Sequence, residues 1–390
     1  MDFQPLREQM ERLAAWRIPG NAAVVYKGRE KIYSFASGFA DVETGEEMTE
    51  DHLINIYSCS KLVTVTAALQ LYERGLLKLD DPLYAFIPEY RRMLVKSADG
   101  LREAASPITI RQLFTMTAGF NYDCGAPAFA RTKEKTNGKM DTLELIRCLA
   151  EEPLEFEPGT HWRYSLGHDV LAGVVEVISG KKFRQYVKEN IFDPLGMTQS
   201  MYHNDEVQDR MATLYRYVNS NQTDAVTLQS GTLAQPDGYL KPVPKDNHYT
   251  FGPEYDSGGA GITTTVEDYA KFCAALAGGG MGINEERILQ VDTVEMMRRN
   301  QLTETQLKDF SWPQLKGCGY GLGVRTMMDP IAAGAIGAAG EFGWGGAAGA
   351  SAYIDIKNGV ALFYAHHMLN PQEEYYQPRI RKALYDSLKR

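Results

Sequence analysis

Residues 58–71 read Ser58-Cys59-Ser60-Lys61-Leu62-Val63-Thr64-Val65-Thr66-Ala67-Ala68-Leu69-Gln70-Leu71, a Ser-x-x-Lys motif followed by an apolar run. If residues 59–71 form a helix, side chains three positions apart share a face, so Lys61 lies one turn above Ser58. The apolar run predicts a buried helix, and burial lowers the pKa of a lysine. A neutral Lys61 can take the proton of the Ser58 hydroxyl, which predicts a serine acyl-transfer enzyme.

Two other serines compete with Ser58 for this role. Ser179-Gly180-Lys181-Lys182 also has the motif, but it follows the apolar run 170–178, so Gly180 is typical of a helix C-cap. Ser60 directly precedes Lys61 and therefore faces another side of the helix. The sequence has no Gly-x-Ser-x-Gly, which excludes the nucleophile elbow of an α/β-hydrolase.

The composition is that of an ordinary globular chain. It has 390 residues, 44% of them hydrophobic and 23% charged, enough for one large domain or two lobes. The net charge of −9 argues against nucleic acid and anionic membrane surfaces as partners. No apolar run reaches the length of a membrane span, and the N-terminus predicts an amphipathic helix instead of a signal peptide.

The cysteines and histidines predict neither disulfides nor a metal site. The five cysteines are odd in number and scattered, which favours a reducing, cytoplasmic location. Neither they nor the seven histidines have the spacing of metal ligands. We therefore expect no metal and no cofactor.

Strands are predicted at both ends of the chain and helices between them. Residues 21–27 and 31–37 form a hairpin pattern, and residues 80–200 are mostly helical, whereas 203–257 is a polar, turn-rich segment without a period. We therefore expect a discontinuous α/β lobe made of residues 1–80 and 258–390. Residues 81–257 would form a mostly helical lobe with a long polar loop at 203–257.

The C-terminal third contains further strand patterns. Residues 320–326 predict one strand, and 350–356 and 360–366 predict a pair joined by Lys357-Asn358-Gly359. The Asn-Gly sequence is typical of a type I′ turn. Ile380, Leu384 and Leu388 indicate a final helix. The two termini should therefore contribute to the same sheet.

Three further motifs follow the Ser-x-x-Lys motif in a characteristic order. They are Pro158-Gly159-Thr160-His161-Trp162-Arg163-Tyr164-Ser165, the Gly-rich segment 258–274, and Trp344-Gly345-Gly346 before the predicted hairpin. Together they resemble the serine β-lactamase-like superfamily, which includes class C β-lactamases and penicillin-binding proteins. The resemblance covers residues 10–390. It implies an α/β (α+β) fold of the β-lactamase/transpeptidase type, in which helices flank an antiparallel sheet and a mostly helical lobe is inserted.

The resemblance also implies a set of site residues. Ser58 would be the nucleophile, Lys61 its proton acceptor, and Tyr164 the phenol that shares the base role and protonates the leaving group. The backbone N–H groups of Ser58 and Ala347 would form the oxyanion hole. The substrate would be bound by Leu166, Trp344, Gly345 and Gly346.

Two departures from the class C pattern bear on the substrate. Leu166 replaces an asparagine that holds the amide of a β-lactam, and Trp344 replaces the lysine that attracts its carboxylate. Both changes put an apolar group where a polar one is expected. With these motifs the chain resembles the family VIII carboxylesterases most closely, and the fungal statin-type acyltransferases more loosely.

These observations predict a hydrolase for small neutral carboxylic esters that acts through an acyl-enzyme on Ser58, or a related acyltransferase. A β-lactamase, a D-Ala-D-Ala carboxypeptidase or a D-aminopeptidase is the first alternative. An acyl-binding protein without turnover is the second. The expected partner is a small-molecule ester or amide, and the sequence leaves the oligomeric state open.

Overall fold

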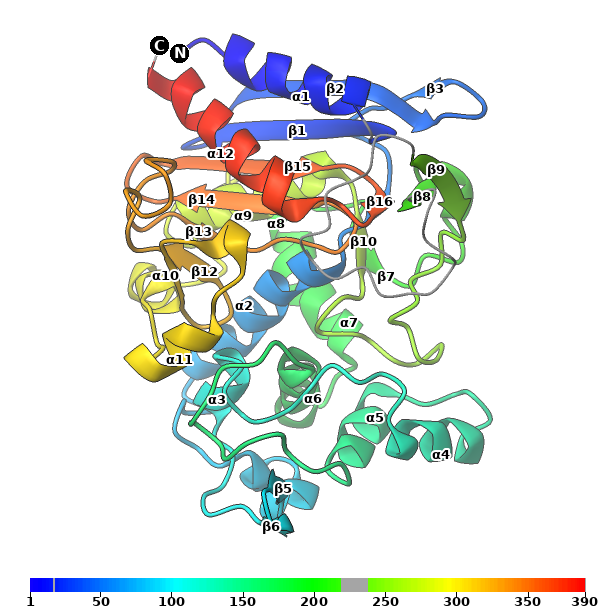
Figure 1. Ribbon diagram of the computed structural model, residues 1–390, viewed down its shortest axis with the longest axis vertical. Coiled ribbons are helices and arrows are strands. Elements are labelled where there is room, and N and C mark those ends of the chain that lie inside the picture. Colours follow the sequence, from blue (N-terminus) through cyan, green and yellow to red (C-terminus); the bar gives the residue numbers. More distant parts are fainter. Residues whose placement is uncertain (17, 219–237, 390) are drawn as a thin grey trace.

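An eight-stranded antiparallel sheet organises one half of the molecule (Figure 1). The computed structural model describes residues 1–16, 18–218 and 238–389. The strand order is β11-β12-β13-β14-β15-β1-β2-β3. The strands are β1 (Gly20–Lys27), β2 (Glu30–Asp41), β3 (Glu46–Glu47), β11 (Cys318–Tyr320), β12 (Arg325–Met327), β13 (Phe342–Gly343), β14 (Ser351–Asp355) and β15 (Val360–Ala365).

Helices cover both faces of this sheet. Helices α1 (Gln4–Trp16) and α12 (Glu373–Lys389) pack on one face, where alternate residues of β1 and β15 form an apolar cluster with them. Helix α9 (Val266–Ala277) covers the opposite face. The N–H of Asp2 donates to the carbonyl of Ser387 at 3.1 Å, so the two ends of the chain meet. Strand β1 pairs with β15, so the N- and C-terminal segments share one sheet, as predicted.

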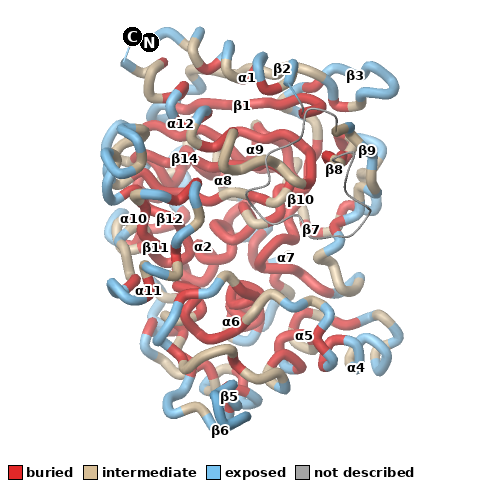
Figure 2. Tube along the Cα trace, viewed as in Figure 1, coloured by how far each residue is buried: buried red, intermediate tan, exposed pale blue. Residues whose placement is uncertain are grey.

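Helix α2 (Ser60–Glu73) runs from the sheet toward the remaining helices. It is buried on all sides along most of its length (Figure 2), which explains why its sequence is apolar all round. It packs against α6 (Gly167–Ser179). The other helices are α3 (Ile110–Phe114), α4 (Pro127–Lys135), α5 (Thr142–Leu149), α7 (Phe183–Val187), α8 (Asp193–Leu195), α10 (Val291–Arg298) and α11 (Glu304–Asp309).

Three small sheets complete the described structure. One consists of β4 (Ile54–Asn55), β10 (Ile262–Thr264) and β7 (Met201–Tyr202) and supports the start of α2. Another consists of β16 (Met368–Leu369), β8 (Leu214–Val218) and β9 (Tyr239–Val243). The third is the hairpin of β5 (Leu94–Ser97) and β6 (Gly100–Glu103).

The segment 203–257 differs from the polar loop that we expected. It contains β8 and β9, because Tyr215 and Tyr217 pack into the cluster beneath α1 and α12. Residues 219–237 of this predicted loop lie outside the described residues. The predicted division into 1–80 with 258–390 and 81–257 stays a prediction.

Two local predictions in the C-terminal third are wrong. Residues 320–326 are not one strand: the chain turns back between β11 and β12, where the N–H of Gly321 donates to the carbonyl of Val324 at 2.7 Å. The β14–β15 turn is not of type I′, because only Gly359 has a positive φ, of 61°. Asn358 instead uses its side-chain amide to donate to Asp355 at 2.6 Å.

Candidate active site

Ser58 lies on a strained turn between β4 and α2. The turn forms a short 3-10 helix, Tyr57–Cys59, in which Tyr57 has a φ of 44°. A bulky residue rarely adopts this left-handed conformation, and such strain is concentrated at functional sites. Tyr57 and Cys59 are buried, whereas Ser58 keeps some exposure. The turn therefore presents the Ser58 hydroxyl and hides its neighbours.

The hydroxyl of Ser58 lies between a lysine and a phenol. The Lys61 Nζ atom is 3.2 Å from the Ser58 Oγ, as expected for residues one helical turn apart. The Tyr164 hydroxyl donates to the same Oγ at 2.6 Å. The structure thus brings together the three side chains that the sequence predicted as nucleophile and proton carriers.

Lys61 is a buried ammonium group with few charges around it. Its side chain is fully buried, and Nζ donates to the carbonyl of Gly259 at 2.8 Å and to the Tyr122 hydroxyl at 3.5 Å. Burial lowers the pKa of Lys61 to about 7, and the charge of Asp169 opposes this decrease. A lysine with this pKa is partly neutral near pH 7 and can act as a base.

Asp169 fixes the position of Gly259, the residue of the Gly-rich segment 258–274 whose carbonyl accepts from Lys61. The Asp169 Oδ1 atom accepts from the Tyr255 hydroxyl at 2.6 Å, the Ser257 hydroxyl at 2.8 Å and the Gly259 N–H at 3.1 Å. A Cβ at Gly259 would lie 2.5 Å from the Asp169 Oδ2, so an alanine here would displace the Asp169 carboxylate or the segment itself. Sequence reasoning missed both Asp169 and Tyr122. An acidic residue in the first turn of an apolar helix is the sequence feature that could have identified Asp169 as a candidate site residue.

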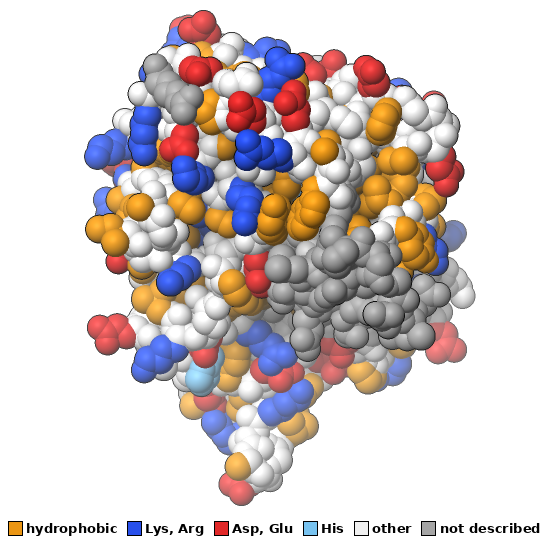
Figure 3. Space-filling model, turned by 45° about the horizontal axis from the view of Figure 1, so that its top comes forward, with side chains coloured by type: hydrophobic (Ala, Val, Ile, Leu, Met, Phe, Trp, Pro, Cys, Tyr) orange, Lys and Arg blue, Asp and Glu red, His pale blue; other side chains and the backbone are white. Residues whose placement is uncertain are grey.

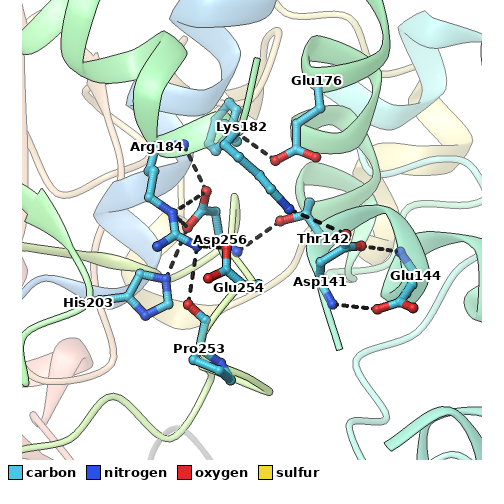
Figure 4. Close-up of polar contacts among 11 residues, drawn as sticks. Asp141, Thr142, Glu144, Glu176, Lys182, Arg184, His203, Pro253, Glu254 and Asp256 are labelled. Atoms are coloured by element: carbon cyan, nitrogen blue, oxygen red, sulfur yellow. Dashed lines mark hydrogen bonds and ion pairs between the residues drawn. The ribbon is translucent and has the colours of Figure 1, made fainter. Parts of the chain in front are cut away.

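An ion pair between the partly exposed Arg184 and the buried Asp256 anchors the segment that leads to Gly259 (Figure 4). Asp256 is fully buried and accepts from the backbone N–H of Arg184 at 2.9 Å. The Arg184 Nε lies 2.8 Å, and the His203 Nε2 3.1 Å, from the Asp256 Oδ1. The Asp256 N–H donates to the Thr142 hydroxyl at 2.9 Å. These contacts fix the chain three residues before Gly259, the residue that contacts Lys61.

The segment 344–350 lies against the Ser58 turn. A Cβ at Gly346 would lie 2.1 Å from the carbonyl oxygen of Ile56, so only glycine fits there. The Gly346 N–H donates to the Ala350 carbonyl at 2.8 Å, and the Gly349 N–H donates to the Gly346 carbonyl at 2.9 Å. This tight turn contains Ala347. The oxyanion role of the Ser58 and Ala347 N–H groups stays a prediction.

Aromatic rings line the site beside Tyr164. The rings of Tyr122 and Trp344 stack on Tyr164, with centroids 5.4 and 5.7 Å away. The Trp312 ring meets Tyr164 edge-on at 5.4 Å. Burial raises the pKa of Tyr164, which keeps this phenol protonated and able to donate. The surroundings of the hydroxyl groups are therefore mainly aromatic and apolar.

Leu166 is placed differently from the other predicted substrate contacts. It precedes α6 as its N-cap residue and is 1% exposed. Its N–H donates to the carbonyl of Asn121 at 3.1 Å. A direct contact between Leu166 and substrate stays a prediction.

Ser60 and Ser179, the other two candidate nucleophiles, form hydrogen bonds that stabilise local structure. The Ser60 Oγ is buried and accepts from the Ile262 N–H at 3.0 Å, which joins α2 to β10. Ser179 ends α6, where Gly180 is the C-cap with a φ of 68°. The Ser179 Oγ accepts from the N–H of Lys181 at 3.3 Å. These contacts favour Ser58 as the nucleophile.

The whole chain is similar to known proteins in sequence. A family model described as Beta-lactamase matches residues 6–385. The chain is 31% identical to the esterase EstB of Burkholderia gladioli over 369 residues, which cover 92% of this chain and 86% of that protein. It is 28% identical to the lovastatin esterase of Penicillium rubens, over 84% of this chain and 83% of that protein.

A solved structure supports the same relationship. EstCE1, described as a hydrolase with promiscuous acyltransferase activity, superposes with a TM-score of 0.78 and 26% identity. The match covers 98% of this chain and 99% of the other.

Proposed function

The chain belongs to the Beta-lactamase family, and we propose that Ser58, Lys61 and Tyr164 are its catalytic residues. It has the β-lactamase/transpeptidase-like fold predicted from the sequence, and it is a serine hydrolase of the esterase type. The observation that supports the residue assignment best is the position of the Ser58 Oγ, 3.2 Å from the Lys61 Nζ and 2.6 Å from the Tyr164 hydroxyl.

These three residues would work in two half-reactions. Neutral Lys61 accepts the Ser58 proton while Oγ attacks the ester carbonyl and forms a tetrahedral oxyanion. The N–H groups of Ser58 and Ala347 would stabilise this oxyanion. Tyr164 then donates its proton to the leaving alcohol and recovers one from Lys61. In the second half-reaction water attacks the acyl carbonyl and gives one proton to neutral Lys61. The bond between the acyl carbon and the Ser58 Oγ then breaks, this proton passes to the Oγ, and the acid is released.

We propose small, neutral carboxylic esters as substrates. The aromatic rings around Tyr164 and the replacement of a lysine by Trp344 favour uncharged groups next to the reacting carbonyl. Transfer of the acyl group to an alcohol in place of water is also consistent with the site, and EstCE1 is described as having such a side activity.

A substrate panel tests this function. Short-chain aryl esters should be hydrolysed well, and a cephalosporin slowly, because Leu166 and Trp344 remove the amide and cationic anchors of a β-lactam. An apolar site rejects a polar analogue only weakly, so residual β-lactam hydrolysis should be low but measurable. The values of kcat/KM for both substrates decide the point. A cephalosporin value equal to that of the best ester would contradict the proposal.

The alternative functions have less support. A D-Ala-D-Ala carboxypeptidase or D-aminopeptidase would cleave D-amino acid peptides faster than any ester in the same panel. An acyl-binding protein would give one burst of product without steady turnover.

The cysteines bear on the compartment. All five are unpaired, and four of them are buried. This fits our proposal of a reducing, cytoplasmic location.

Among the helices of the described residues, none is long and apolar enough to cross a membrane. On the face of the molecule shown in Figure 3, acidic and basic side chains are interspersed.

A further inference from the structure

The first turn of α12 lies beside the segment that contains Trp344. Gln377, on the second turn, lies so close that its Nε2 is 2.6 Å from where a Cβ of Gly345 would be. Residues four apart share a face of a helix, so Glu373 lies on the same face of α12 as Gln377. Glu373 is therefore on the side of the helix that faces the candidate active site.

Glu373 and Gln314 offer hydrogen-bond acceptors without a cation. The Gln314 Nε2 donates to the Glu373 Oε2 at 3.2 Å. Gln314 is 6% exposed, and its Oε1 has no hydrogen-bond partner among the described residues. Within the described part of the chain, no Lys or Arg forms an ion pair with Glu373. A buried acceptor such as the Gln314 Oε1 normally has a donor, and Glu373 beside it is only partly buried, so the cluster suits a donor from a ligand.

The cluster is close to the reacting groups. Gln314 lies two residues after Trp312, whose ring contacts Tyr164 at 5.4 Å and Trp344 at 6.1 Å. Burial raises the pKa values of Tyr164 and Cys59, and the charge of Glu373 adds to both increases. The Glu373 carboxylate therefore lies close enough to act electrostatically on Tyr164 and on Cys59, the residue that follows Ser58.

The charge on Glu373 is sensitive to what binds beside it. Burial raises the pKa of Glu373 to about 7, and the neighbouring Glu374 adds to the increase. A cation at this position would favour the ionised form, whereas a substrate carboxylate would be repelled. The aromatic surface of Trp312 is partly exposed and also attracts cations through its π face.

We propose that Glu373, Gln314 and Trp312 form a subsite for an ammonium group on the alcohol portion of the ester, or on an incoming acyl acceptor. The inference rests on the proposed function and changes one part of it. The acyl group stays small and uncharged, whereas the alcohol portion carries an ammonium group, as in esters of amino alcohols. The alcohol side is indicated because Tyr164, the proposed proton donor to the leaving group, packs directly against Trp312.

Three acetate esters of similar shape test the subsite. They are 3,3-dimethylbutyl acetate, which is neutral, acetylcholine, which is cationic, and 2-(dimethylamino)ethyl acetate, whose protonated form adds one N–H donor. Values of kcat/KM are measured at pH 8, where Glu373 is mostly ionised, for the wild type, Glu373→Gln and Glu374→Gln. Glu374→Gln is the matched control, because it removes one charge from the adjacent position of the same helix.

The wild type and Glu374→Gln should prefer both cationic esters to the neutral one by about tenfold, the size expected for a partly desolvated cation site. Glu373→Gln should lose this preference, which is measured as the ratio of the cationic to the neutral kcat/KM within each variant. Gln314→Leu should reduce the preference mainly for the dimethylamino ester, and it provides a second test if Glu373→Gln does not fold.

Equal kcat/KM values for the three esters in the wild type would overturn the inference. A preference unchanged in Glu373→Gln would overturn it as well. Turnover of the neutral ester shows that the Ser58 chemistry is intact, so either result leaves the proposed function standing. Failure to hydrolyse any ester would instead count against the proposed function and with it the subsite.

Discussion

At the scale of single residues, the buried Lys61 determines how the site responds to pH. Its pKa is lowered to about 7 mainly by burial, while the charge of Asp169 acts in the opposite direction. In the proposed mechanism the neutral lysine is the base, so kcat/KM for a neutral ester should rise as the pH increases through about 7. Below this pH Lys61 is protonated and cannot accept the Ser58 proton.

Asp169→Asn tests the origin of this pKa. The substitution removes the negative charge that raises the pKa of Lys61, so the rising limb of the profile should move to lower pH. The amide oxygen can still accept from Tyr255, Ser257 and Gly259. The measurement is the pH profile of kcat/KM, with Asp80→Asn, which breaks a surface pair with Arg111, as control. An unchanged midpoint, or a shift to higher pH, would contradict the assignment.

The residues that sequence reasoning found are those whose relation is local or belongs to a motif. Ser58 and Lys61 are one helical turn apart, and Tyr164 was carried over from a resemblance. Tyr122 was missed because its contact with Lys61 at 3.5 Å joins distant parts of the chain. Asp169 acts through the N–H of Gly259, which is also a long-range contact that no sequence period reveals.

At the scale of elements, the glycine segment before β10 sets the position of Lys61. Gly259 accepts from Lys61 through its carbonyl and donates to Asp169 through its N–H. Gly259→Ala would place a Cβ 2.5 Å from the Asp169 Oδ2 and 3.2 Å from the Tyr122 hydroxyl. The segment must shift, and a displacement near 1 Å at a catalytic group costs about 100-fold in rate.

The kcat of Gly259→Ala should therefore fall by about one to two orders of magnitude while the protein stays folded. Steady-state kinetics measure the loss of kcat, and a circular dichroism melt shows whether the variant is still folded. Gly125→Ala is the control, because the nearest atom to its Cβ would be the Asp123 Oδ1 at 3.4 Å, an ordinary contact. A normal kcat in Gly259→Ala would show that the segment does not position Lys61.

Helices α3, α5 and α9 begin after Thr109, Asp141 and Thr265, which are residue types that favour the N-cap position. The β14–β15 turn and the 320–326 strand were predicted wrongly, because the local pattern does not include the competing contacts. Asn358 donates to Asp355, and Gly321 and Gly323 let the chain reverse. Tertiary contacts thus override local preference at these turns.

At the scale of the whole molecule, a buried charge cluster joins α12 to the sheet. Glu341 lies 2.8 Å from the Arg325 Nη1 and 3.3 Å from the Arg381 Nε, and all three side chains are at most 3% exposed. Both guanidinium groups also lie over the ring of Tyr353, at 5.3 and 5.4 Å. Arg381 is on α12, whose first turn contains Glu373, so the cluster holds the proposed subsite in place.

Glu341→Gln should destabilise the fold strongly. It leaves two buried cations without a counter-charge, which typically costs about 3–5 kcal/mol. Glu11→Gln is the matched control, because Glu11 forms an exposed pair with Arg7 on α1, worth under about 1 kcal/mol. Urea denaturation gives both free energies of unfolding. Similar small losses in the two variants would contradict a stabilising role for the buried cluster.

The general architecture followed from the order of motifs, but the pairing of strands did not. Strand patterns at both ends of the chain predicted a shared sheet, and β1 does pair with β15. The register that places Ala22 opposite Ala365 depends on packing against α9 and α1, which a sequence pattern does not specify. The strands at 214–218 and 239–243 were missed because their segment is polar overall.

The identity of the nucleophile is tested most directly by labelling the protein with a serine-reactive fluorophosphonate and locating the adduct by peptide mass spectrometry. The adduct should lie on Ser58, because in the proposed mechanism Lys61 and Tyr164 activate this hydroxyl, and ester hydrolysis should disappear as the label is incorporated. Ser58→Ala should take up no label. An adduct on Ser60 or Ser179, or hydrolysis that persists in the fully labelled protein, would contradict Ser58 as the nucleophile.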